Sequence, residues 1–293
     1  MMIDSHCHLS KNDYSNLEEV IKHMQNNIMV ISSATLDDLD EIINLIENNS
    51  NIYATIGIHP EYANTYTQKH LDNIEKKLSH PKVVGIGEIG LDYHYTKENK
   101  EKQQQLFIKQ IKLANKYHKP IVIHTRDAIE DTYNIIKKYK ETNLKCDFHC
   151  YSGSLEMAKR LIPLNAVFGI GGVLTFKNEK KLKEIVRQLD LKYFVLETDS
   201  PYLTPEPFRG KQNEPYNVVF VAEKIAELKT MTSEEVKEQT TKNALNLFDI
   251  NISLWYTNTR FSILKSGGKY EYISAGAGSK MGYHSMRFSH RVI

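Results

Sequence analysis

The chain has 293 residues, of which 41% are hydrophobic and 25% are charged. This composition is typical of globular proteins that bury a core, and it argues against a disordered chain. Thirty-eight basic against 36 acidic residues leave a formal net charge of +2, so no overall positive field indicates nucleic-acid binding, and a polyanion would have to be held by local groups.

Targeting signals and cysteine usage both favour the cytoplasm. The chain reaches Asp4 and His6 without a basic region or an apolar run, and no stretch approaches the roughly 20 consecutive apolar residues that cross a membrane. The three cysteines, Cys7, Cys146 and Cys150, are too few for a disulfide framework and lack Cys-x-x-Cys spacing. We therefore expect a cytoplasmic protein with free thiols and no membrane partner.

Short apolar segments alternate with segments of helical periodicity over the first 250 residues. The helix that carries Leu39, Ile42 and Ile46 on one face is expected to have Thr35 as its N-cap. In chain order, the expected strands are Ile3–His8, Ile28–Ile31, Ile52–Ile58, Val83–Glu88, Ile121–His124, Lys145–His149, Val167–Ile170 and Phe194–Asp199. The expected helices are Leu17–Met24, Leu39–Ile46, Lys69–Leu78, Lys97–His118, Ala128–Tyr139, Leu155–Leu161, Lys180–Leu189, Val218–Leu228 and Glu234–Leu247.

This alternation predicts an α/β fold of parallel strands with helices outside, most simply a single-domain (β/α)8 TIM barrel. A doubly wound open sheet is the alternative. Ionisable residues decide between them, because they fall at or just past the C-terminal ends of the strands, which meet at one mouth in a barrel but not in an open sheet. These residues are His6, His8, His59, Glu88, His124, His149 and Asp199. We expect the barrel to be a monomer.

The periodic pattern stops near Asn251. Ser, Gly, Tyr and Asn replace it, and two glycine-containing segments interrupt the rest of the chain. We therefore predict a barrel domain over residues 1–250 and an irregular tail over 251–293. A hairpin could form in this tail from Phe261–Leu264 and Tyr270–Ile273.

Histidines and carboxylates at the predicted barrel mouth indicate a dinuclear metal site. His6 and His8 are two residues apart in a strand, so their imidazoles point to the same face. We predict that Asp199 joins them on one divalent ion and that His124 and His149 hold a second ion. Glu88 would bridge the two, because a bridging carboxylate is what such a pair requires. The six predicted ligands are His6, His8, Glu88, His124, His149 and Asp199.

Two such ions would lower the pKa of bound water and supply a hydroxide nucleophile near neutral pH. Glu88 and Asp199 are the predicted catalytic residues, and Asp199 could also take up or relay the proton. Imidazole ligands favour Zn, Mn or Co, although chemistry on phosphate also tolerates Mg. Glu197 is interpreted as a residue that supports the ligands or packs behind them.

Cations and aromatic residues near the mouth suggest how a substrate binds. Arg126 lies two residues beyond His124, and Arg209 lies in a loop after the last strand, so both could contact phosphate. His59 is expected to face the substrate. Tyr93 and Tyr202 could stack on a base.

The chain resembles the TatD family of metal-dependent deoxyribonucleases. The resemblance runs in order from Met2 to about Phe248. It rests on the segments Ile3–Leu9, Gly57–Pro60, Gly85–Tyr93, Pro120–Ala128, His149–Gly153, Glu197–Leu203 and Arg209–Pro215. It implies a TIM barrel of the amidohydrolase superfamily that hydrolyses DNA with divalent metals, often from the 3′ end. The six predicted ligands match the family's metal positions one by one, whereas Glu61 stands where many relatives have a second His.

We therefore expect a 3′–5′ exodeoxyribonuclease acting on single-stranded ends. A flexible chain end enters a barrel mouth more easily than a stiff duplex, and stacking on an aromatic face offsets the cost of unstacking its bases. Two alternatives remain. The same site could hydrolyse a small amide, ester or lactone, or the barrel could bind nucleic acid without catalysis.

Overall fold

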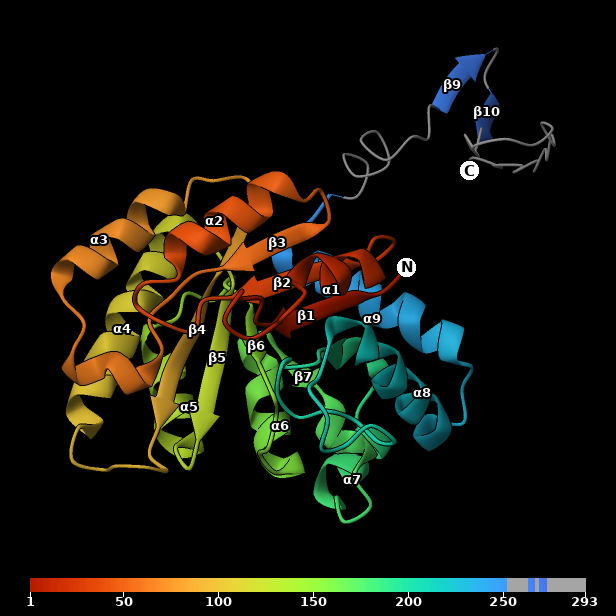
Figure 1. Cartoon of the computed structure of the whole chain (residues 1–293). Helices are drawn as coiled ribbons and strands as arrows, with labels where there is room; N and C mark the ends of the chain where they lie inside the picture. The colour runs from red at the N-terminus through yellow and green to blue at the C-terminus, as the bar shows by residue number, and fades with distance from the viewer. Residues whose placement is uncertain (252–262, 267–268, 273–293) are drawn as a thin grey trace, which may run out of the picture. The chain divides into compact units, whose positions relative to one another are not determined.

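The computed structural model describes residues 1–251, 263–266 and 269–272 (Figure 1). The chain divides into two compact units, Met1–Ile250 and Asn251–Ile293. Within the described residues, no helix combines the length and the apolar character needed to cross a membrane. The three cysteines are free thiols, as the sequence predicts.

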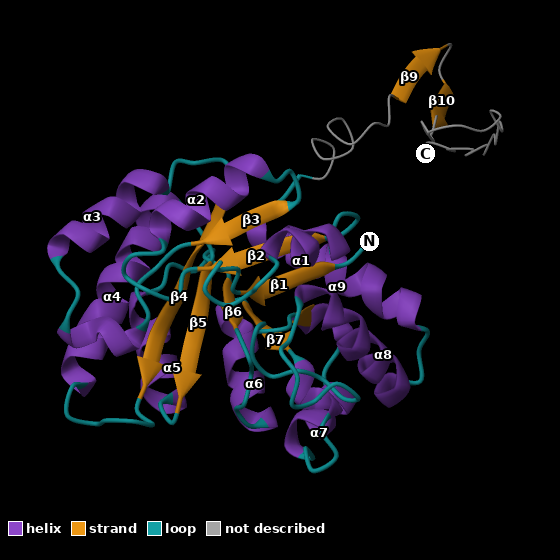
Figure 2. Cartoon of the chain, viewed as in Figure 1, coloured by secondary structure: helices purple, strands orange, loops and turns teal. Residues whose placement is uncertain are grey.

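Unit 1 is a nearly closed barrel, which confirms the predicted TIM-barrel fold (Figure 2). Its strands pair in sequence order, each parallel to the next. They are β1 (Ile3–Cys7), β2 (Ile28–Ser32), β3 (Ile52–Thr55), β4 (Val83–Asp92), β5 (Ile121–Arg126), β6 (Cys146–Phe148), β7 (Ala166–Ile170) and β8 (Phe194–Leu196). Past the end of β8, the N–H of Asp199 donates to the carbonyl of His6 at 3.0 Å. This bond joins the last strand segment to the first, which an open sheet could not do.

Helices follow the strands and cover the outside of the barrel (Figure 2). They are α1 (Leu17–His23), α2 (Leu39–Asn48), α3 (Gln68–Lys77), α4 (Lys100–Tyr117), α5 (Ile129–Tyr139), α6 (Leu155–Leu161), α7 (Lys181–Gln188), α8 (Val218–Lys229) and α9 (Ser233–Phe248). Short 3-10 helices are η1 (Pro60–Asn64), η2 (Ile162–Leu164), η3 (Gly172–Thr175), η4 (Leu191–Tyr193) and η5 (Pro215–Asn217). The apolar residues Ile42, Ile43 and Ile46 of α2 are buried, as their helical spacing predicts.

Helix α9 supports the start of β8. The amide of Asn243 donates to the carbonyls of Leu191 and Phe194 at 2.9 and 2.7 Å. These bonds lie at the N-terminal end of β8, away from the end where Asp199 follows it. A helix contact thus holds the N-terminal end of β8, whereas the ionisable residues lie at the opposite end of the barrel.

Three local predictions need correction. Thr35 does not cap α2, because the carboxylate of Asp38 accepts the N–H groups of Ala34 and Thr35 at 2.6 and 2.8 Å and holds this segment as a turn. β3 ends at Thr55 rather than Ile58, since both backbone groups of Ile58 pair with the side chain of Gln110 on α4.

β4 extends past Glu88 to Asp92, because it stays paired with β5 along this length. Gly90 has a φ of +146°, and a Cβ atom there would lie 2.0 Å from the carbonyl oxygen of His124. Only glycine allows this close approach. The extension places a further carboxylate, that of Asp92, beside β5.

Unit 2 contains an antiparallel strand pair, β9 (Ile263–Ser266) with β10 (Lys269–Tyr272). Lys269 pairs with Ser266 and Tyr272 with Ile263. The predicted hairpin is thus present in the described residues, shifted by up to two positions. Its predicted ends at Phe261 and Ile273 lie outside the described residues.

Candidate metal centre

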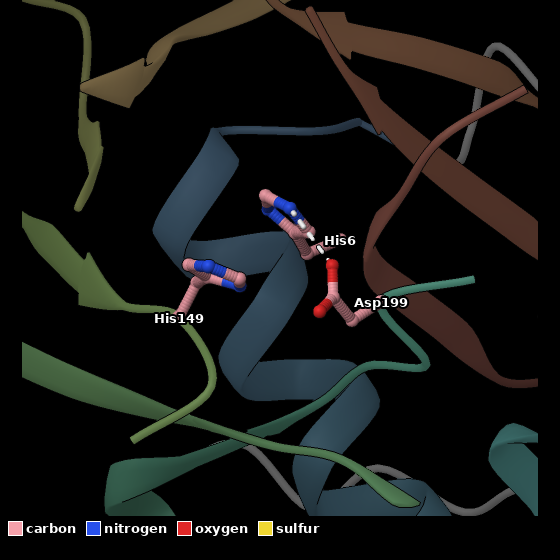
Figure 3. A group of neighbouring side chains, drawn as sticks. All are labelled: His6, His149 and Asp199. Atoms are coloured by element: carbon pink, nitrogen blue, oxygen red, sulfur yellow. Dashed lines mark ion pairs between the residues drawn. The ribbon is translucent and has the colours of Figure 1, made fainter. Parts of the chain in front are cut away.

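The six predicted ligands come from five different strands or the loops that follow them, and they meet at one end of the barrel. His6 lies on β1 and His8 directly after it, Glu88 lies on β4 and His124 on β5, whereas His149 follows β6 and Asp199 follows β8. Figure 3 shows His6, His149 and Asp199 pointing toward one another. The barrel thus gathers residues from both ends of unit 1 into one cluster.

The carboxylate of Glu88 lies between two groups of imidazoles. Its Oε2 is 3.6 Å from Nε2 of His6. Its Oε1 is 2.6 Å from Nδ1 of His124 and 2.9 Å from Nε2 of His149. Because the two oxygens face different imidazoles, this one carboxylate can contact two cations at once.

Asp199 completes the side of the cluster next to His6 and His8. Its Oδ1 is 3.7 Å from Nε2 of His6 and 3.6 Å from Nε2 of His8. The ring of His149 also stacks on that of His6, with the centroids 3.9 Å apart. Within the described residues, three overlapping triplets could each hold an ion: His6, His149 and Asp199; His6, His8 and Glu88; and His59, Glu88 and His124. How the ligands divide between two ions therefore stays a prediction.

The residues present fit divalent metal ions. Nε2 of His6 is buried and has no hydrogen-bond partner within the described residues. Burial and the neighbouring His149 lower the pKa of His6 well below its usual value, so its imidazole is neutral. A buried polar atom without a partner is costly unless it binds something. Neutral imidazole together with carboxylates is a typical set of ligands for transition metals.

The other side of the cluster carries protons when no metal is bound. Burial acts to lower the pKa of His124, but hydrogen bonds to Asp92 and Glu88 raise it to about 9. Burial has the same effect on His149, and Glu88 raises its pKa to about 10. Burial acts to raise the pKa of Glu88, yet His149 and His124 hold it well below its usual value. Without a metal, His124 and His149 are therefore both protonated near pH 7, and their extra protons lie on the side of each ring that faces Glu88.

We expect Zn²⁺ binding at pH 7 to release at least two protons per chain, because a metal ligates only neutral imidazole and both His124 and His149 are protonated before it binds. In the metal-free protein, the ion pairs of His124 and His149 with Glu88 stabilise the fold. This stabilisation is complete below pH 6.5 and is lost as the pH rises through about 9 to 10. Calorimetric titration in buffers of different ionisation enthalpy counts the protons, and His149→Ala should release about one fewer. Equal proton release by the variant would contradict this assignment.

Residues behind the cluster hold the histidine rings. Nδ1 of His8 donates to the carbonyl of Ser32 at 3.0 Å, and Nδ1 of His6 lies 3.2 Å from the hydroxyl of Ser32. Glu197 lies behind His149, with 3.8 Å between its Oε1 and Nδ1 of His149. The N–H of Cys150 also donates to this Oε1 at 2.6 Å. The carboxylate of the buried Glu197 thus lies beside His149 and the backbone of Cys150.

Sequence reasoning missed two residues that contact the predicted ligand histidines, Ser32 and Asp92. Ser32 stands at the end of an apolar segment, where it gave no signal of its own. Asp92 lies inside the segment Gly85–Tyr93, and its Oδ2 is 3.0 Å from Nε2 of His124. The signal that could have identified Asp92 is a strand long enough to run four residues past Glu88 beside His124.

His59 and Tyr202 lie close to the cluster, as predicted for residues that face a substrate. Nε2 of His59 is 3.9 Å from Oε1 of Glu88, and Nδ1 of His59 is 3.7 Å from the carboxylate of Glu61. Tyr202 is 59% exposed, and its ring centroid is 6.3 Å from that of His8. Both side chains thus lie beside the cluster, and their contact with a substrate stays a prediction.

The two predicted phosphate contacts differ in their surroundings. Arg126 ends β5, and its guanidinium donates to the hydroxyl of Tyr95 at 3.4 Å and lies 5.1 Å from the ring centroid of that tyrosine. The guanidinium of Arg209 lies 4.1 Å from the ring centroid of Phe176. Arg126 thus lies at the end of the strand that carries His124, whereas Arg209 packs on Phe176, directly after η3.

The hypothesis that Tyr93 stacks on a base is wrong. Tyr93 is 3% exposed, and its hydroxyl donates to Asp131 at 2.9 Å, so its ring belongs to the core. Tyr95, two residues later, is 82% exposed and packs beside Arg126. Sequence alone could not separate the two, because a strand-to-loop transition decides which tyrosine is buried.

The chain is similar to proteins from both bacteria and archaea. It is 43% identical over 255 residues to the Bacillus subtilis protein YabD, described as an uncharacterized metal-dependent hydrolase, with 86% of this chain and 100% of that one covered. It is 34% identical to Escherichia coli YcfH, described in the same way, with 86% and 97% covered. A relative from Methanocaldococcus jannaschii is 36% identical over 251 residues, with 84% and 96% covered.

A solved structure and a family model agree with these relatives. The Escherichia coli TatD homolog YJJV superposes with a TM-score of 0.79 at 27% identity, covering 85% of this chain and 98% of that one. The model of the family described as TatD related DNase matches residues 3–249, a range that includes every predicted ligand. The chain is therefore a metal-dependent hydrolase of the TatD-related DNase family.

Proposed function

We propose that this protein hydrolyses DNA phosphodiester bonds, working from the 3′ end of single strands. The observation that carries the proposal is the position of Glu88, whose two carboxylate oxygens face different imidazoles at the mouth of the barrel. A carboxylate placed in this way suits a pair of divalent cations, and phosphodiester hydrolysis is a reaction that such pairs serve.

His6, His8 and Asp199 would hold one cation, His124 and His149 the other, and Glu88 both. When bound, the cations supply positive charge that stabilises a developing phosphorane and lowers the pKa of water.

Asp199 has the position of a proton acceptor. Its Oδ1 faces His6 and His8, and its side chain remains accessible from the mouth. A carboxylate so placed can take the proton from attacking water and later return it to the leaving 3′ oxygen. Glu197 is too deeply buried for this role.

Residues at the rim support a single-stranded substrate. The exposed ring of Tyr202 offers a stacking surface on the side of His8, and Arg126 with Tyr95 offers a cation beside a second exposed ring. Rings and cations of this kind bind unpaired nucleotides with little regard to sequence. The 3′ direction rests on the family resemblance.

Time courses on a single strand labelled at its 5′ end test this proposal. We expect a ladder that shortens one nucleotide at a time, and its complete loss in excess chelator with recovery on adding Mn²⁺, Co²⁺, Zn²⁺ or Mg²⁺. A covalently closed circular single strand is the matched control, since it has no end. Rapid cutting of the circle, or full activity in chelator, would refute the proposal, and cleavage of only a small carboxylic ester would favour the alternative hydrolase.

A further inference from the structure

Asp92 is held rigidly at the end of β4. Its backbone N–H donates to the side chain of Gln103 at 2.8 Å, and its carbonyl accepts from the same amide at 2.7 Å. Its Oδ1 accepts the N–H of His94 at 2.8 Å. With the backbone and one carboxylate oxygen fixed, the buried Asp92 has only Oδ2 left to offer a neighbour.

That oxygen meets His124. Nε2 of His124 lies 3.0 Å from Oδ2 of Asp92, while Nδ1 of the same ring lies 2.6 Å from Oε1 of Glu88. Both ring nitrogens therefore face a carboxylate, and a cation bound between His124 and Glu88 would take the place of the proton on Nδ1. The neutral imidazole would then keep its one proton on Nε2, facing Asp92, and direct the lone pair of Nδ1 at the cluster.

The histidines on the other side of the cluster have no such partner. His6 and His8 both contact Ser32, through its hydroxyl and its carbonyl, and both of these groups are neutral. The carboxylate of Glu197 lies 3.8 Å from Nδ1 of His149, beyond hydrogen-bond distance. Among the predicted ligand histidines, His124 therefore stands apart, because a carboxylate holds its second ring nitrogen at hydrogen-bond distance.

We propose that Asp92 is a positioning residue for one metal only: it orients His124 to bind through Nδ1 and tightens the site that His124 shares with His149, without serving the site of His6 and His8. The inference rests on the proposed metal centre. Carboxylates that hold a ligand histidine typically contribute 10- to 100-fold in metal affinity, so the two sites should respond to a change at Asp92 by different amounts.

Zn²⁺ titration of the metal-free protein, in competition with a chromophoric chelator, resolves the two binding steps. Asp92→Asn preserves size but can accept at only one oxygen, so it cannot serve both His94 and His124. We expect it to weaken one step about 10- to 100-fold and to leave the other within about threefold. Co²⁺ absorption should change for the weakened site alone, and the circular dichroism spectrum of the metal-free variant should match that of the wild type, which shows that the fold is retained.

Asp127→Asn is the matched control. Like Asp92→Asn, it removes one negative charge near His94, because the carboxylate of Asp127 lies 3.0 Å from Nδ1 of His94. It should leave both binding steps unchanged. Asp92→Ala is a second variant that should reproduce the selective loss. Equal weakening of both steps by Asp92→Asn, or the same loss in Asp127→Asn, would indicate a general charge effect and overturn the inference.

A double-variant cycle separates this inference from the proposed function. His124→Ala should weaken the same step, and adding Asp92→Asn to it should cause little further loss, because Asp92 acts through His124. If His124→Ala weakens a step and Asp92→Asn does not, the inference fails while the metal centre stands. If His124→Ala leaves both steps intact, the metal assignment itself fails.

Discussion

Replacing Glu88 with glutamine is expected to lower hydrolysis by about 10³-fold or more, a barrier increase of roughly 4 kcal/mol. The carboxylate contacts His6 through one oxygen and both His124 and His149 through the other. A glutamine amide offers a single oxygen, and its NH2 group cannot ligate a cation. The change therefore removes an oxygen ligand from one metal site and the negative charge from both, and it leaves a donor pointing at the histidines.

Metal content and kcat/KM measured on the same preparation test this prediction. Glu88→Gln should weaken both binding steps, whereas His149→Ala should weaken mainly one, because Nε2 of His149 meets only Oε1 of Glu88 at 2.9 Å. Because His149→Ala also removes a buried predicted ligand, the comparison separates the loss of a bridging carboxylate from the loss of a ligand to one ion. Full retention of two metals by Glu88→Gln would remove Glu88 from the bridging position.

Asp199→Asn is expected to reduce kcat by about 10²- to 10⁴-fold, the usual contribution of a general acid or base. The asparagine keeps one oxygen that can face His6 and His8, where Oδ1 of Asp199 now lies. It cannot take up a proton from water near neutral pH. The loss should therefore appear in kcat more than in metal content or KM.

Tyr202→Ala is the comparison for this second prediction. Tyr202 lies at the rim, near His8 but largely exposed, so its removal should raise KM for single-stranded DNA and leave kcat nearly unchanged. Single-turnover rates at saturating DNA separate the two effects. An Asp199→Asn variant with wild-type single-turnover rates would exclude proton transfer by Asp199.

Local pattern was enough to predict the barrel and the gathering of the predicted ligands. The strand and helix periods of 2 and 3.6 are properties of the backbone, so the apolar runs at Ile28–Ile31 and Ile121–His124 identify strands wherever they lie in the fold. The same reasoning places His6 and His8 on one face. Parallel strands in a barrel bring their C-terminal ends together, which is why side chains as far apart as His6 and Asp199 could be predicted to meet.

Tertiary packing decided which neighbours these side chains have. Burial of Tyr93 and exposure of Tyr95 depend on where β4 leaves the sheet, and the contact of Asp92 with His124 depends on how far β4 stays paired with β5. Glu88 directs each oxygen to different histidines only because residues from β1, β5 and the loop after β6 surround it. Sequence determines residue type and period along the chain, whereas the orientation of a carboxylate and the choice of its partners arise from contacts between segments far apart in that chain.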